Sequence, residues 1–174
     1  MSARRKSSWR EKLENDHGLP RVCKIDPAKS PRWGTGTMAI PAPREVDALM
    51  RRVPRGKLTT IDEIRKALAR RHEATVTCPL TTGIFAWIAA HAAAEAEAER
   101  QKNTTAFWRT LKAGGELNAK YPGGIALLKK RLRGEGHTIA QKGKRFFVRN
   151  YEASLAALDE GREGEPAKNA AGVC

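Results

Sequence analysis

Residues 81–109, TTGIFAWIAAHAAAEAEAERQKNTTAFWR, decide the fold of this 174-residue chain. The stretch begins as a helix, because the hydroxyl of Thr81 or Thr82 can cap the first turn. Large side chains at three- and four-residue spacing predict one buried stripe, formed by Ile84, Trp87, Ile88 and His91. The opposite face then carries small residues: Thr82, Gly83, Ala86, Ala89, Ala90 and Ala93. Such a face allows close approach of another surface, either DNA or a neighbouring helix.

Two shorter helices are predicted before this stretch. The first, from Pro43 to Val53, has its apolar residues on one side: Val46, Leu49, Met50 and Val53. The second follows the turn VPRGK, and Thr60 stands three residues before Glu63, which is capping-box spacing. Its inner face is predicted to hold Ile61, Ile64, Ala67 and Leu68. Two short helices followed by a third give the order of a helix-turn-helix.

The segment after the long helix alternates turns with short elements. AFWRTL (106–111) predicts a short strand or turn, and the glycines of AGG and YPGG predict two tight turns. IALLKKRLRGEG (125–136) predicts a basic helix. HTIAQKGKRFFVRN (137–150) predicts a β-hairpin that turns at Lys142-Gly143, and residues 151–158 predict a final short helix. The expected fold is therefore mainly α, a winged helix-turn-helix-like domain with a small β-hairpin.

The charge of the chain points to a polyanionic partner. Thirty-three Lys and Arg against nineteen Asp and Glu give a net charge of +14 and a pI of about 10.2. Residues 109–149 carry eleven basic and two acidic side chains, so the excess is uneven. No apolar run approaches the ~20 residues of a membrane helix, which argues against membrane partners.

The cysteines and histidines predict neither a disulfide framework nor a metal site. Cys23, Cys78 and Cys174 have no repeated spacing, so a reducing cytoplasm is the expected setting, with nucleoid association in a bacterium. No metal-ligand spacing or cofactor motif is present, and no cofactor is expected.

Composition divides the chain into three parts. Residues 1–42 form a basic N-terminal extension, with a short helix expected around residues 8–15 and with Trp9 and Trp33 able to pack or stack. Residues 43–158 form the predicted domain, and residues 159–174 are expected to be a flexible tail.

The order of these motifs over residues 43–137 resembles the C-terminal DNA-binding domain of the alkylguanine-DNA alkyltransferases. TTGIFAWIAAH lies where that family has its recognition helix, and AFWRTL lies where it has its Pro-Cys-His-Arg-Val active-site segment. Phe107 and Trp108 thus replace the acceptor cysteine and its histidine, and Arg109 is kept. The chain is most similar to the alkyltransferase-like proteins, which have tryptophan in place of the cysteine and bind damaged DNA without repairing it. Ile61 and a residue near Leu80 replace the family's tyrosine and its base-replacing arginine.

The resemblance and the charge pattern together imply a set of site residues. The expected DNA contacts are Thr81, Thr82, Gly83, Ala86, Arg109, Lys112, Lys129, Lys130, Arg133, Lys142 and Lys144. The expected lesion pocket comprises Phe107, Trp108, Tyr121, Gly123 and Gly124. The implied partners of a monomeric protein are double-stranded DNA, including DNA with an alkylated guanine, and other DNA-repair proteins.

Three other functions remain open from the sequence. A divergent alkyltransferase could use Cys78, since a thiol near a helix N-terminus can be activated. A winged-helix transcriptional regulator would read the major groove, although the long helix lacks the long polar side chains expected of it. The basic arm could also bind RNA.

Overall fold

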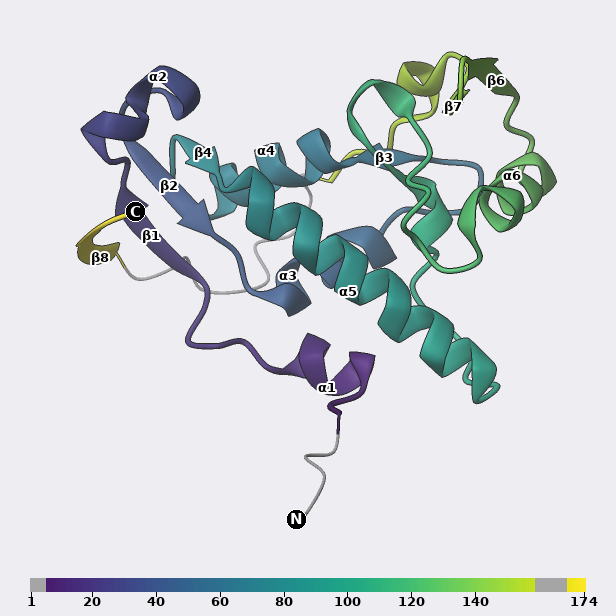
Figure 1. Cartoon of the computed structure of the whole chain (residues 1–174), viewed down its shortest axis with the longest axis horizontal. Coiled ribbons are helices and arrows are strands. Elements are labelled where there is room, and N and C mark those ends of the chain that lie inside the picture. Colours follow the sequence, from purple (N-terminus) through teal and green to yellow (C-terminus); the bar gives the residue numbers. More distant parts are fainter. Residues whose placement is uncertain (1–5, 159–168) are drawn as a thin grey trace.

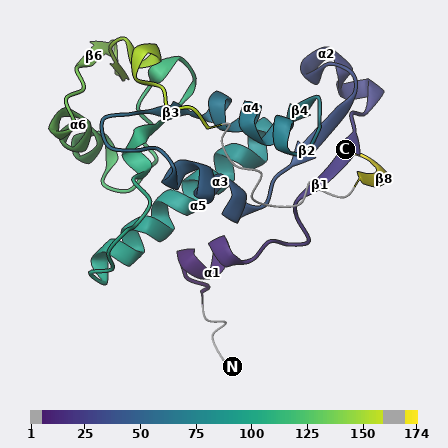
Figure 2. The same ribbon diagram turned by 180° about the vertical axis from the view of Figure 1, so that it is seen from behind.

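The structure is a computed structural model that describes residues 6–158 and 169–174. The helix α5 (Pro79–Ala98) runs through it. The short helix α1 (Trp9–Glu14) and the helices α3 (Pro43–Arg51) and α4 (Ile61–Arg71) pack against it (Figure 1). In the reverse view as well, α3 lies beside α5 (Figure 2). One long helix therefore organises the hydrophobic core, as the sequence predicts.

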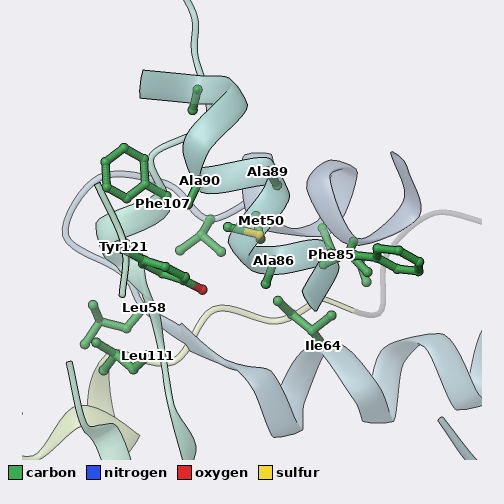
Figure 3. Packing of buried hydrophobic residues seen from close by; sticks show 14 of the residues in the cluster. Met50, Leu58, Ile64, Phe85, Ala86, Ala89, Ala90, Phe107, Leu111 and Tyr121 are labelled. Atoms are coloured by element: carbon green, nitrogen blue, oxygen red, sulfur yellow. The ribbon is translucent and has the colours of Figure 1, made fainter. Parts of the chain in front are cut away.

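The face that α5 buries is the opposite of the predicted one. Ala86, Ala89 and Ala90 are fully buried and lie among larger side chains from neighbouring elements, including Met50 and Tyr121 (Figure 3). Small side chains let helices approach closely, so α3 and α1 can pack directly on this face. Of the large side chains in the predicted stripe, Ile84 is 42% exposed, and Trp87 and Ile88 are only partly buried against the core. The expected buried stripe is therefore wrong.

The helix also begins earlier than predicted. Its N-cap is Cys78, and neither Thr81 nor Thr82 caps it. Thr82 is fully buried, and its hydroxyl donates to the carbonyl of Cys78 at 2.7 Å. Since Thr82 and Ala86 have no exposed surface, their prediction as DNA contacts is wrong, whereas Thr81 and Gly83 are partly exposed.

The two helices before α5 form as predicted. The apolar side chains of the α3 region are at most 1% exposed: Val46, Leu49, Met50 and Val53. Thr60 caps α4, because its hydroxyl accepts from the amide of Glu63 at 3.2 Å. In α4, Ile64 and Leu68 are fully buried, as expected from their spacing. Their burial anchors α4 on the core.

The N-terminal segment is built into the fold. The strands β1 (Arg21–Lys24) and β2 (Thr37–Ile40) pair antiparallel, with a turn of 3-10 helix η1 (Pro27–Lys29) and the helix α2 (Ser30–Trp33) between them. The strands β4 (Val76–Thr77) and β8 (Asn169–Val173) complete a sheet with the order β4-β2-β1-β8. Residues 6–42 are therefore not a separate extension, and residues 169–173 are not a tail. The rest of the predicted tail, 159–168, lies outside the described residues.

A disulfide joins Cys23 in β1 to Cys174 at the end of the chain. Their Cα atoms are 5.5 Å apart, although 151 positions separate them in the sequence. The amide of Cys174 also donates to the carbonyl of Lys24 at 2.8 Å. The sequence predicted no disulfide, because spacing alone cannot show that β8 returns to the edge of β1.

The C-terminal half begins with short elements that pack against α5 and contribute to the core. It contains the 3-10 turn η2 (Phe107–Arg109), β5 (Thr110–Leu111), the turn η3 (Ala113–Gly115) and α6 (Gly124–Gly134). Parallel pairing joins β5 to β3 (Thr59–Thr60). The predicted hairpin is confirmed as β6 (Ile139–Lys142) and β7 (Arg145–Val148), with Lys142 opposite Arg145.

The last predicted helix forms only one turn, the 3-10 helix η4 (Tyr151–Ser154). Helices dominate the fold and the sheets are small. Among the described residues, no helix is both long and apolar enough to span a membrane.

Candidate nucleic-acid interface

An open groove of about 870 Å³ lies along the outward face of α5. Its mainly apolar lining comes from two elements that are distant in sequence. The α5 side consists of Pro79, Leu80, Gly83, Ile84, Trp87 and His91, and the other side consists of Lys112, Glu116, Asn118, Ala119 and Lys120. In Figure 1 the second wall belongs to the segment between β5 and α6 that passes beside α5. An apolar floor with a cationic rim fits a planar group that carries a negative charge nearby.

Leu80 stands at one side of this groove and is 68% exposed. Gly83, one turn away, has open space where a side chain would project. The two residues therefore leave the mouth of the groove wide and apolar.

The wall of the groove is fixed to the basic hairpin through Glu116. The carboxylate of Glu116 accepts from Lys112 Nζ at 3.1 Å and from Arg145 Nη2 at 2.5 Å. The Arg145 guanidinium is the main cause that holds the pKa of Glu116 below its ordinary value, and Lys112 adds to it, although burial opposes both. The amide of Leu117 also donates to the carbonyl of Phe146 at 2.9 Å. The hairpin and the groove are thus one continuous surface.

Most of the predicted cationic contacts are exposed on α6 and the hairpin: Lys130, Arg133, Lys142 and Lys144. Lys129 is half-buried, with Nζ 4.4 Å from the centroid of the Phe146 ring. Lys112 is exposed at the groove, although it is paired with Glu116. Sequence reasoning left Arg145 and Lys120 out of the site. Arg145 lies opposite Lys142 across the hairpin, so the register of the predicted turn could have identified it.

Arg109 is not a surface cation. Its Nε and Nη2 atoms donate to the Glu135 carboxylate at 2.8–3.0 Å, and its Nη1 donates to the carbonyl of Val53 at 2.8 Å. The side chains of Arg109 and Glu135 are only 15% and 7% exposed. The prediction of Arg109 as a DNA contact is therefore wrong, because a buried carboxylate already uses its donors. These contacts tie η2 to Val53 after α3 and to Glu135 at the end of α6.

The predicted lesion pocket is closed. Phe107 is fully buried and Tyr121 is 3% exposed, and their rings meet edge to face with centroids 6.0 Å apart. Burial also raises the pKa of Tyr121, whose hydroxyl therefore stays protonated. These two side chains fill the space in which a base was expected, so their assignment as a base-binding pocket is wrong (Figure 3).

The other three predicted pocket residues have structural contacts. Trp108 Nε1 donates to Glu135 at 2.8 Å, and the Arg131 guanidinium lies 4.3 Å from the centroid of the Trp108 ring. Gly123 has a positive φ of 77°, and a side chain there would collide with Leu127. Gly124, with φ of 62°, begins α6. Gly123 and Gly124 shape the turn before α6, Trp108 contacts the end of α6, and none of the three lines the groove on α5.

Cys78 is buried at 8% exposure in a small cluster with Ile25 and Met38, beneath the first turn of α5. Its burial separates the thiol from the groove, where a substrate would lie. Among the described residues, no group of three His, Cys, Asp or Glu side chains could hold a metal ion.

Comparison with known proteins gives one structural similarity. No family model matches the sequence, and a search of curated proteins finds no significant match. A solved structure, S. pombe Atl1 in complex with damaged DNA containing O6-carboxymethylguanine, aligns with a TM-score of 0.46 and 20% sequence identity. The alignment covers 66% of this chain and 94% of the Atl1 chain. A TM-score below 0.5 does not by itself establish a shared fold.

Proposed function

We propose that this protein binds double-stranded DNA and recognises alkylated or otherwise damaged bases without repairing them, in the manner of an alkyltransferase-like protein. The observation that supports this most directly is the apolar groove on α5, joined through Glu116 to a cationic hairpin. Phosphates attract the cations, whereas an unstacked base needs an apolar slot. The surface offers both features side by side.

The duplex would lie across the groove and the hairpin. Lys142, Lys144, Lys130 and Arg133 are exposed and supply phosphate contacts, which set affinity but carry no sequence information. Leu80 at the groove mouth is suited to wedge between base steps, since apolar side chains do this in proteins that bend or open a duplex. An altered base that stacks poorly leaves the helix at lower cost. Preference for damage would follow from that lower cost.

The absence of repair is part of the proposal. By resemblance, Phe107 and Trp108 stand where the alkyltransferases have their cysteine and histidine, and neither ring can accept an alkyl group by that route. The protein would then mark damage for other repair proteins while acting as a monomer. A transcriptional regulator is less well supported, because the exposed face of α5 presents Leu80, Gly83 and Ile84 in place of long polar side chains.

Binding to duplex DNA is expected to weaken steeply with salt. The measurement is the fluorescence anisotropy of a labelled duplex, with either guanine or O6-methylguanine at one central position, over a series of salt concentrations. Replacing Lys142 and Lys144 with alanine should reduce the slope of log K against log salt by about 0.9 for each phosphate that the variant no longer neutralises. The ratio of the affinities for the two duplexes should change little, because the hairpin is not in the groove.

A matched control removes two lysines elsewhere, Lys24 in β1 and Lys66 in α4, both exposed. The control pair should leave the slope unchanged. An equal reduction in both double variants would mean that net charge alone drives binding and would refute the proposed surface. Equal wild-type affinity for both duplexes would refute damage recognition.

Incubation with alkylated DNA is expected to leave the mass of the protein unchanged. The reason is that Phe107 cannot accept an alkyl group and Cys78 is buried at 8% exposure. The measurement is intact-mass spectrometry of the full chain after incubation with an excess of O6-methylguanine duplex. A stoichiometric gain of one methyl group that disappears in Cys78→Ser would establish a divergent alkyltransferase in place of a binding protein.

A further inference from the structure

Three aromatic rings meet at the end of the groove, and one of them comes from α1. The Trp9 ring stacks on His91 with centroids 4.5 Å apart and an interplanar angle of 25°. Trp9 also meets Trp87 edge to face at 4.7 Å, and Trp87 meets His91 at 5.0 Å. These three residues are called the aromatic triad below. Edge-to-face and stacked contacts fix ring orientation, so each ring restrains the other two.

The triad is part of the groove because Trp87 and His91 line it. The Trp87 indole Nε1 donates to the carbonyl of Lys120 at 3.2 Å, which ties α5 to the opposite wall. Trp9 therefore lies behind two residues that a ligand in the groove would touch. The Trp9 side chain does not itself line the groove.

The helix α1 is held firmly enough to position these rings. Ser8 and Glu11 form a reciprocal capping box at its start. Leu13 is buried in the main core, at 7% exposure. Arg10 joins α1 to the far end of α5 through Glu95 and Glu99. The cap, the buried Leu13 and the Arg10 ion pairs together make α1 a fixed support for the groove.

Positive charge surrounds the triad. Lys12 Nζ lies 4.0 Å from the centroid of the Trp9 ring, and Lys120 is exposed on the opposite wall. Burial is the main cause that lowers the pKa of His91, and Lys12 lowers it further, while a hydrogen bond involving the Lys120 backbone opposes them. His91 is therefore a neutral ring at neutral pH, suited to stacking. The two lysines supply the charge that a neighbouring phosphate requires.

We propose that α1 completes the base-binding groove, with Trp9 as a positioning residue that holds Trp87 and His91 so that they can stack against an unpaired base of a DNA duplex. This inference rests on the proposed function and adds the N-terminal helix to the site. A ring that is already held in place loses less conformational freedom when a base stacks on it, so the base binds more tightly. Without Trp9, Trp87 and His91 lose the ring that restrains both of them. Recognition of the altered base should then decline while phosphate contacts on the hairpin persist.

The test compares Trp9→Ala with Trp9→Phe in the full chain. Anisotropy measures the affinity of each variant for the O6-methylguanine duplex and for the matched guanine duplex. Trp9→Ala should lower the ratio of these affinities by about tenfold, which corresponds to the loss of one stacked base. Its affinity for the unmodified duplex should stay within about twofold, because that binding depends on phosphate contacts. Trp9→Phe keeps an aromatic ring and should therefore retain most of the wild-type ratio of the two affinities.

Two controls separate positioning from a general loss of structure. Trp33 is partly buried against the small cluster that contains Ile25, Met38 and Cys78. Trp33→Ala should therefore leave the ratio of the two affinities unchanged. Trp9→Leu keeps apolar volume without an aromatic face, so it decides the question if the alanine variant does not fold. A preserved ratio in a folded Trp9 variant, or a parallel loss for both duplexes, would overturn the inference. A wild-type ratio of one would instead refute damage recognition itself, and the inference with it.

Discussion

Glu135→Ala is expected to lower the free energy of unfolding by about 3–5 kcal/mol, because it leaves the buried Arg109 guanidinium without its counter-charge. Glu135 accepts from Arg109, from Trp108 Nε1 and from the Gly56 amide at 3.0 Å. Its side chain is 7% exposed, so little water can replace these bonds. The turn before β3 and η2 would both lose the acceptor that ties them to the end of α6.

Urea denaturation of the disulfide-intact protein measures this loss. Glu135→Gln keeps an oxygen acceptor and most of the volume, so its loss should be smaller than that of the alanine variant. Alanine at Glu152, an exposed carboxylate, serves as the surface control and should change stability little. A loss below about 1 kcal/mol in Glu135→Ala would show that the pair behaves as a solvated surface ion pair.

The Glu135 carboxylate also makes the free energy of unfolding depend on pH. Burial alone would raise the pKa of Glu135, but the hydrogen bonds from Arg109, Gly56 and Trp108 outweigh it and hold the pKa below its ordinary value. A pKa that is lower in the folded chain stabilises the fold above the ordinary glutamate pKa. That contribution is lost as the pH falls through the folded-state pKa. The difference between wild type and Glu135→Gln should therefore shrink in acid.

Phe107→Ala is the second large effect, with an expected loss of about 3–5 kcal/mol in the free energy of unfolding. Phe107 is fully buried and meets both Trp108 and Tyr121 edge to face. Truncation leaves a cavity where η2 crosses the core, and the surrounding α5 and α6 cannot collapse into it without moving. Thermal or urea denaturation provides the measurement.

Phe147→Ala gives the matched comparison. Phe147 is a half-buried phenylalanine on β7 with the Arg145 guanidinium 5.2 Å from its ring centroid. Its truncation should destabilise the fold much less, because no closed cavity results. Equal losses in the two variants, or a loss below about 1.5 kcal/mol at Phe107, would contradict the description of Phe107 as a core residue.

The local elements were predictable, because their signals are local. Thr60 caps α4 at the expected spacing, and the hairpin turns where Lys142-Gly143 indicates. The helical spacing of the apolar residues in α3 likewise predicted that helix correctly. The orientation of α5 was not predictable in this way, since its first half is apolar on every side. Periodicity then cannot choose the inner face, and the close approach of α3 and α1 selects the alanines.

The site was harder to predict than the fold. The groove combines Trp87 in α5 with Lys120, more than thirty positions later, and only tertiary packing brings them together. The expected pocket followed the alkyltransferase resemblance to Phe107 and Tyr121. The rings at these two positions occupy the space that was expected to form the pocket. The pairing of β1 with β8 was missed for a similar reason, because the two strands lie far apart in the sequence.

The bond between Cys23 and Cys174 has a consequence for how the chain responds to proteolysis. With a sequence separation of 151, it encloses almost the whole polypeptide in one covalent ring. A single cut anywhere between the two cysteines would open the ring but would leave the two fragments attached. Nicked protein should therefore migrate as one band on a non-reducing gel and separate into two bands after reductant is added.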